Sequence, residues 1–286
     1  MATVDTVRSD LRAPRPSTLS LVPTALREIS SRRRLIRYVV RADLVKKGSD
    51  TVLGNVWWVL DPLLQMAVYV VLVTVILKTT KEAYPLFIFC AILPWKWFTS
   101  SVGDAITSVT GREKIIKQVN FPKIVLPVAA TVSGIVNFAF GLIPLFCLLL
   151  LFYPNHLSWW PVLIPVVAFV QFFFTLAVAT LLSAVNVFYR DVGNVIRHLL
   201  RLWFYLSPAL YGADQITAIT EKSRVMSLIF GLNPWSPIFE SYRNLIYYGQ
   251  PPLWGPLAAV LIGSLVLCAL AMVMFKRLEP SFAKVL

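Results

Sequence analysis

Six long apolar stretches separated by short polar segments constrain this chain more than any other feature of its sequence. The hydrocarbon core of a bilayer is roughly 30 Å thick, and roughly 20 apolar residues in a helix cross it. Inside lipid the backbone must satisfy its own hydrogen bonds, as a helix does. We therefore predict an all-α, polytopic membrane protein with six transmembrane helices, at about Val56–Leu77, Pro85–Val109, Ile124–Tyr153, Trp160–Val187, Val195–Tyr211 and Leu253–Phe275.

Composition supports a membrane protein and makes the chain strongly basic. Hydrophobic residues make up 57% of the 286 residues and charged residues 14%, which leaves too little polar surface to cover a soluble globule. The net charge is +13 at pH 7, but the lysines and arginines gather in the N-terminal part and in short loops beside apolar stretches. Loops that face anionic lipid headgroups have this distribution. We expect membrane lipids as partners and no nucleic acid.

The N-terminal part divides into a tail and a helix, ahead of a six-span domain at 51–286. Residues 1–30 carry three prolines among serines, threonines and arginines, and we predict a mobile cytoplasmic tail there. No apolar segment of a signal peptide follows the early arginines.

Residues 31–50 have apolar positions at helical spacing, with Arg34, Arg37 and Arg41 projecting from another side. This pattern predicts an amphipathic helix in the cytoplasmic headgroup region. The alternative is a basic helix that packs on the protein itself.

Two charged residues lie inside predicted spans. Asp61 is within two turns of the cytoplasmic edge, where its carboxylate still reaches water, so we favour a structural role over a binding role. Lys96 lies between Trp95 and Trp97, far from either end of its span. A cation at that depth either faces a polar path through the protein or extends past the two indoles towards the interface.

A polar, basic segment, GREKIIKQVNFPK, separates the second and third spans at Gly111–Lys123. Four of its thirteen residues are Lys or Arg, and it is long enough for about three turns of helix. Pro122 ends such a helix where the next span starts. In a chain otherwise this apolar the segment must meet water or another protein, and we predict a protein contact.

Residues 212–252 join the last two spans but are too apolar for a solvated loop. We predict two short helices, near Glu221–Phe230 and Pro234–Tyr248, which dip back into the bilayer face. Non-helical backbone at such depth is tolerated only when it packs in protein or lines a cavity.

Basic residues are distributed unequally between the two sides of this topology. Of the 27 lysines and arginines, 21 fall in residues 1–55, in 111–123, around the turn at Arg190 or near the C-terminus, and five fall on the other side. By the positive-inside rule both termini and the 111–123 segment are cytoplasmic. The opposite turn near His156 carries no Lys or Arg, and we expect His156 to be exposed to solvent.

The sequence contains no motif for nucleotide binding, metal binding or covalent catalysis. It has no G-x-x-x-x-G-K-[ST], H-E-x-x-H, Cys/His cluster or G-x-S-x-G pattern. The spans also lack the paired carboxylates and broken-helix repeats of ion-coupled transporters. We therefore predict no catalytic or metal-binding residues and no cofactor in this chain, and energy for uphill transport would have to come from another subunit.

Aromatic residues, 13% of the chain, supply flat apolar faces suited to sugar C–H surfaces and edges that hydrogen-bond hydroxyls. The alternative for each is an interfacial anchor or a packing residue. The candidate channel or gate residues are Trp95, Lys96, Trp97, Trp203, Trp235, Tyr242 and Tyr247.

Six motifs occur in an order that resembles a known family. They are VLGNVWWVLDPLLQMAVY at 52–69, ILPWKWF at 92–98, IIKQVNFPKIVLP at 115–127, NVFYRDVGNV at 186–195, LSPALY at 206–211 and LNPWSPIFESYRNLIYYGQPP at 232–252. Together they resemble the ABC-2 type permease subunits that export lipid-linked polysaccharides and polyol phosphates, such as O-antigen, teichoic acid and galactan exporters.

The resemblance implies a homodimer of six-span subunits around a central channel in the bacterial inner (plasma) membrane. Two copies of a separate ABC ATPase subunit would bind below it and hold the ATP and Mg. The resemblance makes 31–47 an interface helix, the helices within 221–248 outer gate helices, and 111–120 a coupling helix. The coupling residues it implies are Arg112, Glu113, Lys114 and Lys117.

The implied substrate is a polyprenyl-diphosphate-linked glycan, which enters lipid-first near the interface helix. By analogy, Arg34, Arg37 and Arg41 would attract the diphosphate. Asp61 and Lys96 depart from the family pattern, so their roles stay open. Two alternatives remain: an ABC-2 exporter of a drug or another lipid, and a membrane enzyme acting on polyprenyl-phosphate lipids. Such an enzyme would need clustered acidic residues for a divalent cation, and the acids here are scattered.

Overall fold

The computed structural model describes residues 18–49, 52–76, 81–212 and 224–286, and the regular structure in these ranges is entirely helical. The predicted all-α class is confirmed for them. The α-helices are α2 (Thr18–Ser31), α3 (Arg33–Ser49), α4 (Trp57–Val70), α5 (Tyr84–Ser108), α6 (Glu113–Gln118), α7 (Val125–Phe152), α8 (Ile164–Phe188), α9 (Val192–Leu206), α11 (Arg224–Leu232), α12 (Trp235–Arg243) and α13 (Trp254–Val285). π-Helical turns extend α4 over Val71–Ile76 and α12 over Asn244–Tyr248, and 3-10 turns occupy Gly54–Val56, Thr110–Arg112, Pro154–His156 and Trp160–Leu163.

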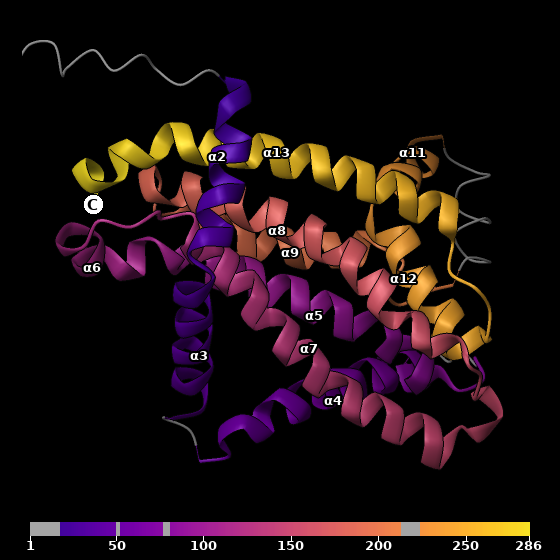
Figure 1. The fold of residues 1–286 in the computed structure, drawn as a ribbon. Coiled ribbons are helices and arrows are strands. Elements are labelled where there is room, and N and C mark those ends of the chain that lie inside the picture. Colours follow the sequence, from indigo (N-terminus) through magenta and orange to yellow (C-terminus); the bar gives the residue numbers. More distant parts are fainter. Residues whose placement is uncertain (1–17, 50–51, 77–80, 213–223) are drawn as a thin grey trace, which may run out of the picture.

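Five of these helical segments are long and apolar enough to cross a membrane. They are Trp57–Val75, Tyr84–Ser108, Val125–Phe152, Trp160–Phe188 and Trp254–Val285. In Figure 1 the long helices run alongside one another, with α6 and the C-terminus at one end and α12 at the other. We call these the α6 end and the α12 end.

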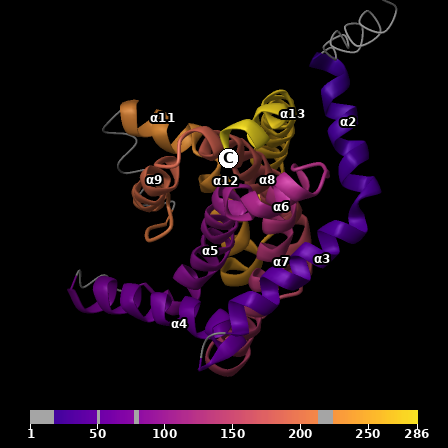
Figure 2. The same ribbon diagram turned by 90° about the vertical axis from the view of Figure 1, so that its left-hand side faces the viewer.

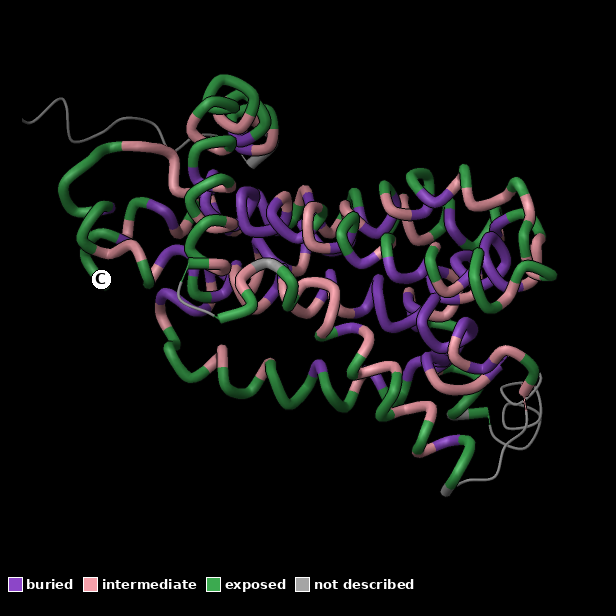
Figure 3. Tube along the Cα trace, turned by 90° about the horizontal axis from the view of Figure 1, so that it is seen from below, coloured by how far each residue is buried: buried purple, intermediate pink, exposed green. Residues whose placement is uncertain are grey.

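Helix α5 forms the centre of the bundle and contacts α4, α7, α8, α9 and α12. It is apolar on every side from Leu86 to Leu93, and a helix of that kind is stable when buried on every side. Viewed from below in Figure 3, the buried residues lie along the middle of the bundle and the exposed ones along the outer helices. Gly134 lets α7 approach α5 closely, because a Cβ there would lie 2.0 Å from the Ser101 Oγ.

Helices α8 and α13 run in the same direction. They pack extensively on each other, and the rings of Phe188 and Phe282, near their C-terminal ends, are 6.0 Å apart. Because both helices end at the α6 end, the chain between them must return to the α12 end before α13 begins.

This return passes through α9 and is shorter than the predicted fifth span. Near the start of α9, Gly193 lies against Ile106, close to the C-terminal end of α5. Beyond the end of α9, the Leu210 carbonyl accepts a hydrogen bond of 3.2 Å from the hydroxyl of Tyr84, at the N-terminal end of α5. The 15 residues of α9 rise about 22 Å, so extended backbone after Leu206 completes the path. Pro208 explains the early stop, since a residue before proline is driven to extended conformation, as Ser207 is (φ −99°, ψ 152°).

The N-terminal tail is more ordered than predicted over 18–30, the part that the structure describes. Leu21 and Ala25 of α2 are buried, and α2 packs across α13. Their spacing of four residues places both on one helical face. Two residues make too short a repeat to be recognised in the sequence. Residues 1–17 of the predicted tail lie outside the described residues.

Helix α3 packs on α7 and buries Val39, and its position in the headgroup region stays a prediction. Figure 2, seen along the bundle from the α6 end, shows α3 on the flank opposite α9, while α4 projects away from the other helices.

Candidate functional site

Helix α6 is a short exposed helix held by one buried side chain. Ile116 is buried, whereas Ile115 and Lys114 are exposed and Lys117 lies beside Glu113 with its Nζ 2.7 Å from the Glu113 carboxylate. The hydrogen bond and the charge of Lys117 lower the pKa of Glu113 below its usual value. The helix proper spans six residues, fewer than the three turns predicted, and leaves an apolar surface rimmed by lysines free for a contact.

Arg112 turns away from that surface. Its Nη2 lies 2.5 Å from the Asp43 carboxylate of α3, and its Nη1 donates to the Ser108 carbonyl at 3.3 Å. One turn further along α3, Lys47 pairs with Asp104 of α5 at 2.5 Å. Of the four predicted coupling residues, Arg112 therefore ties the segment to α3 instead of projecting from it.

The other end of the 111–123 segment is fixed to α13. The Lys123 backbone N–H donates to the Glu279 carboxylate at 2.6 Å. Glu279 also pairs with Lys276 at 2.6 Å, and Lys276 pairs with Glu28 of α2 at 2.8 Å. The segment is thus attached at one end to α3 and at the other to α13.

Asp61 and Lys96, the two charges predicted inside spans, pair with each other between α4 and α5. They line a cavity of about 210 Å³ with Lys47 and Trp97. An ion pair offsets much of the cost of a charge at this depth. The structure thus pairs Asp61 with Lys96 of the same chain, and the structural role favoured for Asp61 and the channel role of Lys96 stay predictions.

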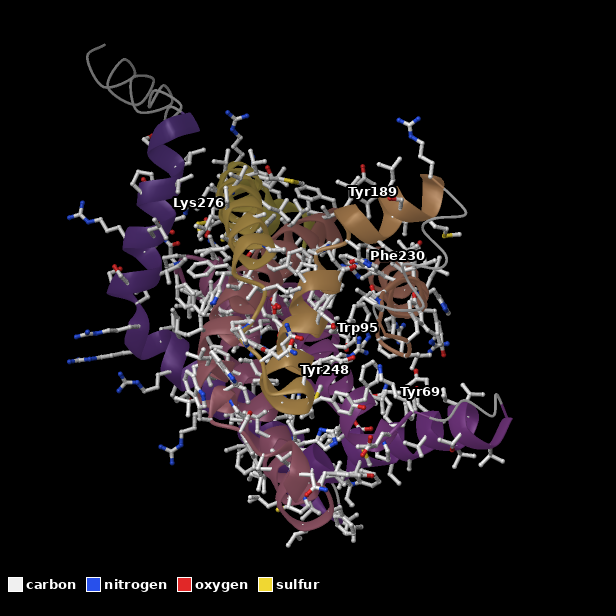
Figure 4. All side chains as sticks on the ribbon, turned by 90° about the vertical axis from the view of Figure 1, so that its right-hand side faces the viewer. Tyr69, Trp95, Tyr189, Phe230, Tyr248 and Lys276 are labelled. Atoms are coloured by element: carbon white, nitrogen blue, oxygen red, sulfur yellow. The ribbon has the colours of Figure 1, made fainter. Side chains whose placement is uncertain are left out.

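The predicted aromatic candidates divide into two groups. Trp95, Trp203 and Trp235 meet inside the bundle, with the Trp95 ring 6.2 Å from Trp203 and 4.9 Å from Trp235 in edge-on contacts. Trp97 stacks on Phe138 of α7 instead. Figure 4 labels Trp95 at the bundle centre.

Tyr242 and Tyr247 also pack inside the protein. The Tyr242 hydroxyl donates to Gln171 at 3.0 Å, and the Tyr247 hydroxyl donates to the Glu82 carbonyl at 2.6 Å. His156, expected to be exposed, is half-buried, because its ring stacks on Tyr247 at 4.8 Å and its Nδ1 lies 2.7 Å from the Tyr247 carbonyl. Sequence spacing carries no sign of this contact, which joins segments 91 residues apart.

Arg243 is fully buried near the α12 end. Its guanidinium donates to the carbonyls of Ala209 and Tyr211 at 2.6 and 3.2 Å, in the non-helical stretch that follows α9. It lies 3.8 Å from the centre of the Phe87 ring and 3.6 Å from the Glu240 carboxylate. Arg243 thus satisfies backbone groups that the end of α9 leaves without helical partners.

The largest cavity described, about 990 Å³, lies between α4, α5 and α9 and extends to the α6 end. Tyr69 and Trp95 line it, as do Arg190, Arg197 and Arg201. Figure 4 shows Tyr69 on α4 and Trp95 on α5, both beside α9. We call this cavity the α9 groove. The three interface-helix arginines, Arg34, Arg37 and Arg41, are exposed on α3 and do not line it.

Comparison with known proteins identifies the family of this chain. The family model described as ABC-2 type transporter matches residues 34–247. The chain belongs to the ABC-2 type transporter family. An O-antigen export system permease protein RfbA of Myxococcus xanthus is 35% identical over 259 residues, which cover 91% of this chain and 98% of that protein. Two proteins of the same description from Klebsiella pneumoniae are each 28% identical over 255 residues, or 88% of this chain and 95% of theirs.

As an ABC-2 permease, the chain is a multi-pass membrane protein, and its described residues contain five candidate helical spans. The family's permeases are not ATPases themselves, and membership implies a separate ABC ATPase subunit as partner.

Proposed function

We propose that this ABC-2 permease exports a polyprenyl-diphosphate-linked polysaccharide from the cytoplasmic side of a bacterial inner membrane. Similarity to an O-antigen export permease over nearly the full length of both proteins carries the proposal. Two copies of the ATPase subunit would bind ATP and Mg and supply the energy, and the glycan would pass between two copies of this chain.

The topology that we propose has six crossings, with α9 and the extended residues after it as the fifth. The parallel direction of α8 and α13 supports it, because the chain must return between them. Burial of Ser207 and Ala209 supports it too, since non-helical backbone at membrane depth must pack inside protein. Helices α11 and α12 would be the outer gate helices, and α3 the interface helix.

This topology predicts the side on which reporter domains appear. Fusions after residues 188 and 286 are expected to report the cytoplasm, and fusions after residues 153 and 212 the outer side. Each fusion point is tested with two reporter proteins: a fluorescent protein that folds only in the cytoplasm and a phosphatase that is active only on the outer side. A cytoplasmic signal at 212 would leave five crossings and contradict the proposal.

The ATPase contact would lie on α6, with Glu113, Lys114 and Lys117 at its surface. Its exposure and its attachment at both ends support this role, because a docking helix must be accessible and must transmit force. Arg112 would act within the chain as the link to α3.

The faces of α4 and α9 support a second copy of the chain as partner. Pro62 is the one buried residue of α4, while Leu64, Val68 and Val71 are exposed on it. Lipid tails could cover this apolar face. Because the face lies beside an arginine-lined groove, however, contact with a second copy of the chain would cover it and also enclose the groove between the two copies.

Deletion of the chain from its host tests the cargo. We expect surface polysaccharide to disappear while the lipid-linked glycan accumulates inside, because synthesis continues without export. Extraction of glycolipids and surface staining with and without a plasmid copy measure both. Normal surface glycan in the deletion strain, or loss of resistance to a drug instead, would contradict a glycan cargo and favour the drug- or other-lipid exporter.

A further inference from the structure

The α9 groove carries positive charge that the chain itself does not neutralise. Among the described residues, none of Arg190, Arg197 and Arg201 pairs with a carboxylate. Glu113 is the one acidic residue in the described lining; Lys117 pairs with it, and the charge of Arg190 also acts on it, so one carboxylate faces three arginines. The groove is therefore electropositive.

Two of these arginines lie well inside α9. Arg197 and Arg201 are four residues apart and so share one helical face. Arg201 is nine residues beyond Val192, which places it about 14 Å along the helix. A charged side chain at that depth in a span faces water or a counter-ion, because lipid solvates it poorly. The groove must hold one or the other.

Helix α5 forms the opposite wall with small and hydroxyl-bearing residues. Thr99, Gly103 and Thr107 follow one another at four-residue spacing, below Trp95. The wall thus offers hydroxyl groups along its length and an indole at its inner end. Trp95 is itself 5% exposed, so only an edge of it is available.

Asn186 supplies a second sign of a ligand. It is 4% exposed, its Nδ2 donates to the Ile106 carbonyl at 2.9 Å, and it lines the groove. Its Oδ1 is buried and has no hydrogen-bond partner among the described residues. Buried acceptors are rarely left unpaired, so a hydroxyl from a ligand or from water in the groove would complete this site.

We propose that the α9 groove binds the diphosphate and first sugars of the lipid-linked glycan, a step that rests on the function proposed above. Guanidinium groups match phosphate oxygens in shape and charge. Arg197 already donates from its Nε to the Gly193 carbonyl at 3.3 Å and from its Nη2 to the Asn194 Oδ1, so it would offer the diphosphate its remaining N–H groups beside Arg201. Sugar hydroxyls pair with Asn186 and the threonines of α5. The volume of about 990 Å³ is at the upper end of the roughly 300–1,000 Å³ typical of ligand sites.

This site differs from the predicted one on α3. Arg34, Arg37 and Arg41 lie on a flank of the subunit opposite α9 (Figure 2), in the open and without a surrounding cavity in the described structure. They suit a first encounter with the headgroup. The groove arginines are exposed as well, but they line a cavity of about 990 Å³ that can hold it.

Binding to the permease–ATPase complex in lipid nanodiscs tests the proposal. Fluorescent polyprenyl diphosphate and polyprenol of equal length are the probes, with inorganic pyrophosphate as competitor. In Arg197→Gln/Arg201→Gln we expect diphosphate binding to weaken at least tenfold, polyprenol binding to stay unchanged, and competition by pyrophosphate to vanish. Arg197→Lys/Arg201→Lys should keep most of the affinity, because the charge remains.

Two matched variants make the result specific to the groove. Arg224→Gln removes an exposed arginine near the α12 end and should change nothing. Arg34→Gln/Arg37→Gln/Arg41→Gln tests α3. Wild-type affinity in the groove variant, or equal loss of diphosphate and polyprenol binding, would overturn the assignment. So would loss confined to the α3 variant.

A cysteine at position 201 gives an independent readout if the double variant does not insert. In a chain with its three cysteines replaced, Arg201→Cys should react with a membrane-impermeant thiol reagent applied at the α6 end, and polyprenyl diphosphate should slow the reaction. An unreactive or unprotected thiol would refute an aqueous ligand site.

The proposed cargo and the proposed binding site can fail separately. Glycan export that needs the chain but is normal in the groove variant would contradict only the binding site. Diphosphate binding that depends on the arginines, in a chain that exports no glycan, would contradict only the proposed cargo.

Discussion

Replacement of Glu113, Lys114 and Lys117 together by alanine is expected to abolish export. These side chains project from α6, whose own attachment to the bundle is through Ile116, Arg112 and Lys123. In the docking that we propose, their loss removes contacts with the ATPase and leaves the fold intact. We expect surface glycan to fall to the level of a deletion strain and substrate-stimulated ATP hydrolysis to fall to the basal rate, with normal amounts of protein in the membrane.

A matched variant separates docking from a general loss of basic charge. Arg33→Ala/Lys284→Ala removes two exposed cations, from α3 and from the end of α13, and should export normally. Co-purification of the ATPase with each variant measures docking directly. Wild-type export by the α6 variant would exclude this helix as the coupling element.

Arg243→Leu is expected to have the largest effect on stability. The substitution leaves the carbonyls of Ala209 and Tyr211 without their donor and Glu240 without its partner, all beside a buried aromatic ring. Removing one member of a buried ion pair costs roughly 3–5 kcal/mol. At about 2–4 °C per kcal/mol for a chain near this size, the midpoint of thermal unfolding should fall by roughly 10 °C.

Two further substitutions show whether the effect comes from the hydrogen bonds. Arg243→Lys keeps the charge but reaches one carbonyl at a time, so its midpoint should lie between those of the wild type and Arg243→Leu. Arg224→Leu, at an exposed arginine, should leave the midpoint unchanged. Fluorescence-detected unfolding of the detergent-purified protein provides the measurement. An unchanged midpoint in Arg243→Leu would mean that other groups satisfy the two carbonyls.

Sequence reasoning located five spans because hydrophobic length is a direct physical requirement of the bilayer. It overestimated α9 because apolar composition continues to Tyr211, whereas Pro208 already ends the helix. Pro208 carries the signal for this stop, because the residue before a proline is driven out of helical conformation. Residues 213–223, which include part of the first predicted gate helix, lie outside the described residues.

The candidate site was less accessible to sequence reasoning because it depends on contacts between distant residues. Asp61 and Lys96 were noted separately, although opposite charges in consecutive spans are a signal of pairing. The four-residue spacing of Arg197 and Arg201 within an apolar stretch indicates a polar face of a span, a signal that a count of basic residues by loop does not use. Nothing in the sequence signals that Arg112 meets Asp43 or that Glu279 meets Lys123.

The Asp61–Lys96 pair also bears on how the chain is made. Helix α5 is second among the spans to leave the ribosome, yet α7, α8 and α12, which bury most of its surface, are synthesised after it. During that interval Lys96 would face lipid alone if α4 were not already in place with Asp61. The two helices are therefore suited to enter the membrane together as a hairpin, in which Asp61 pairs with Lys96 during insertion. Helix α4 would then stabilise α5 in the membrane before the later helices are made.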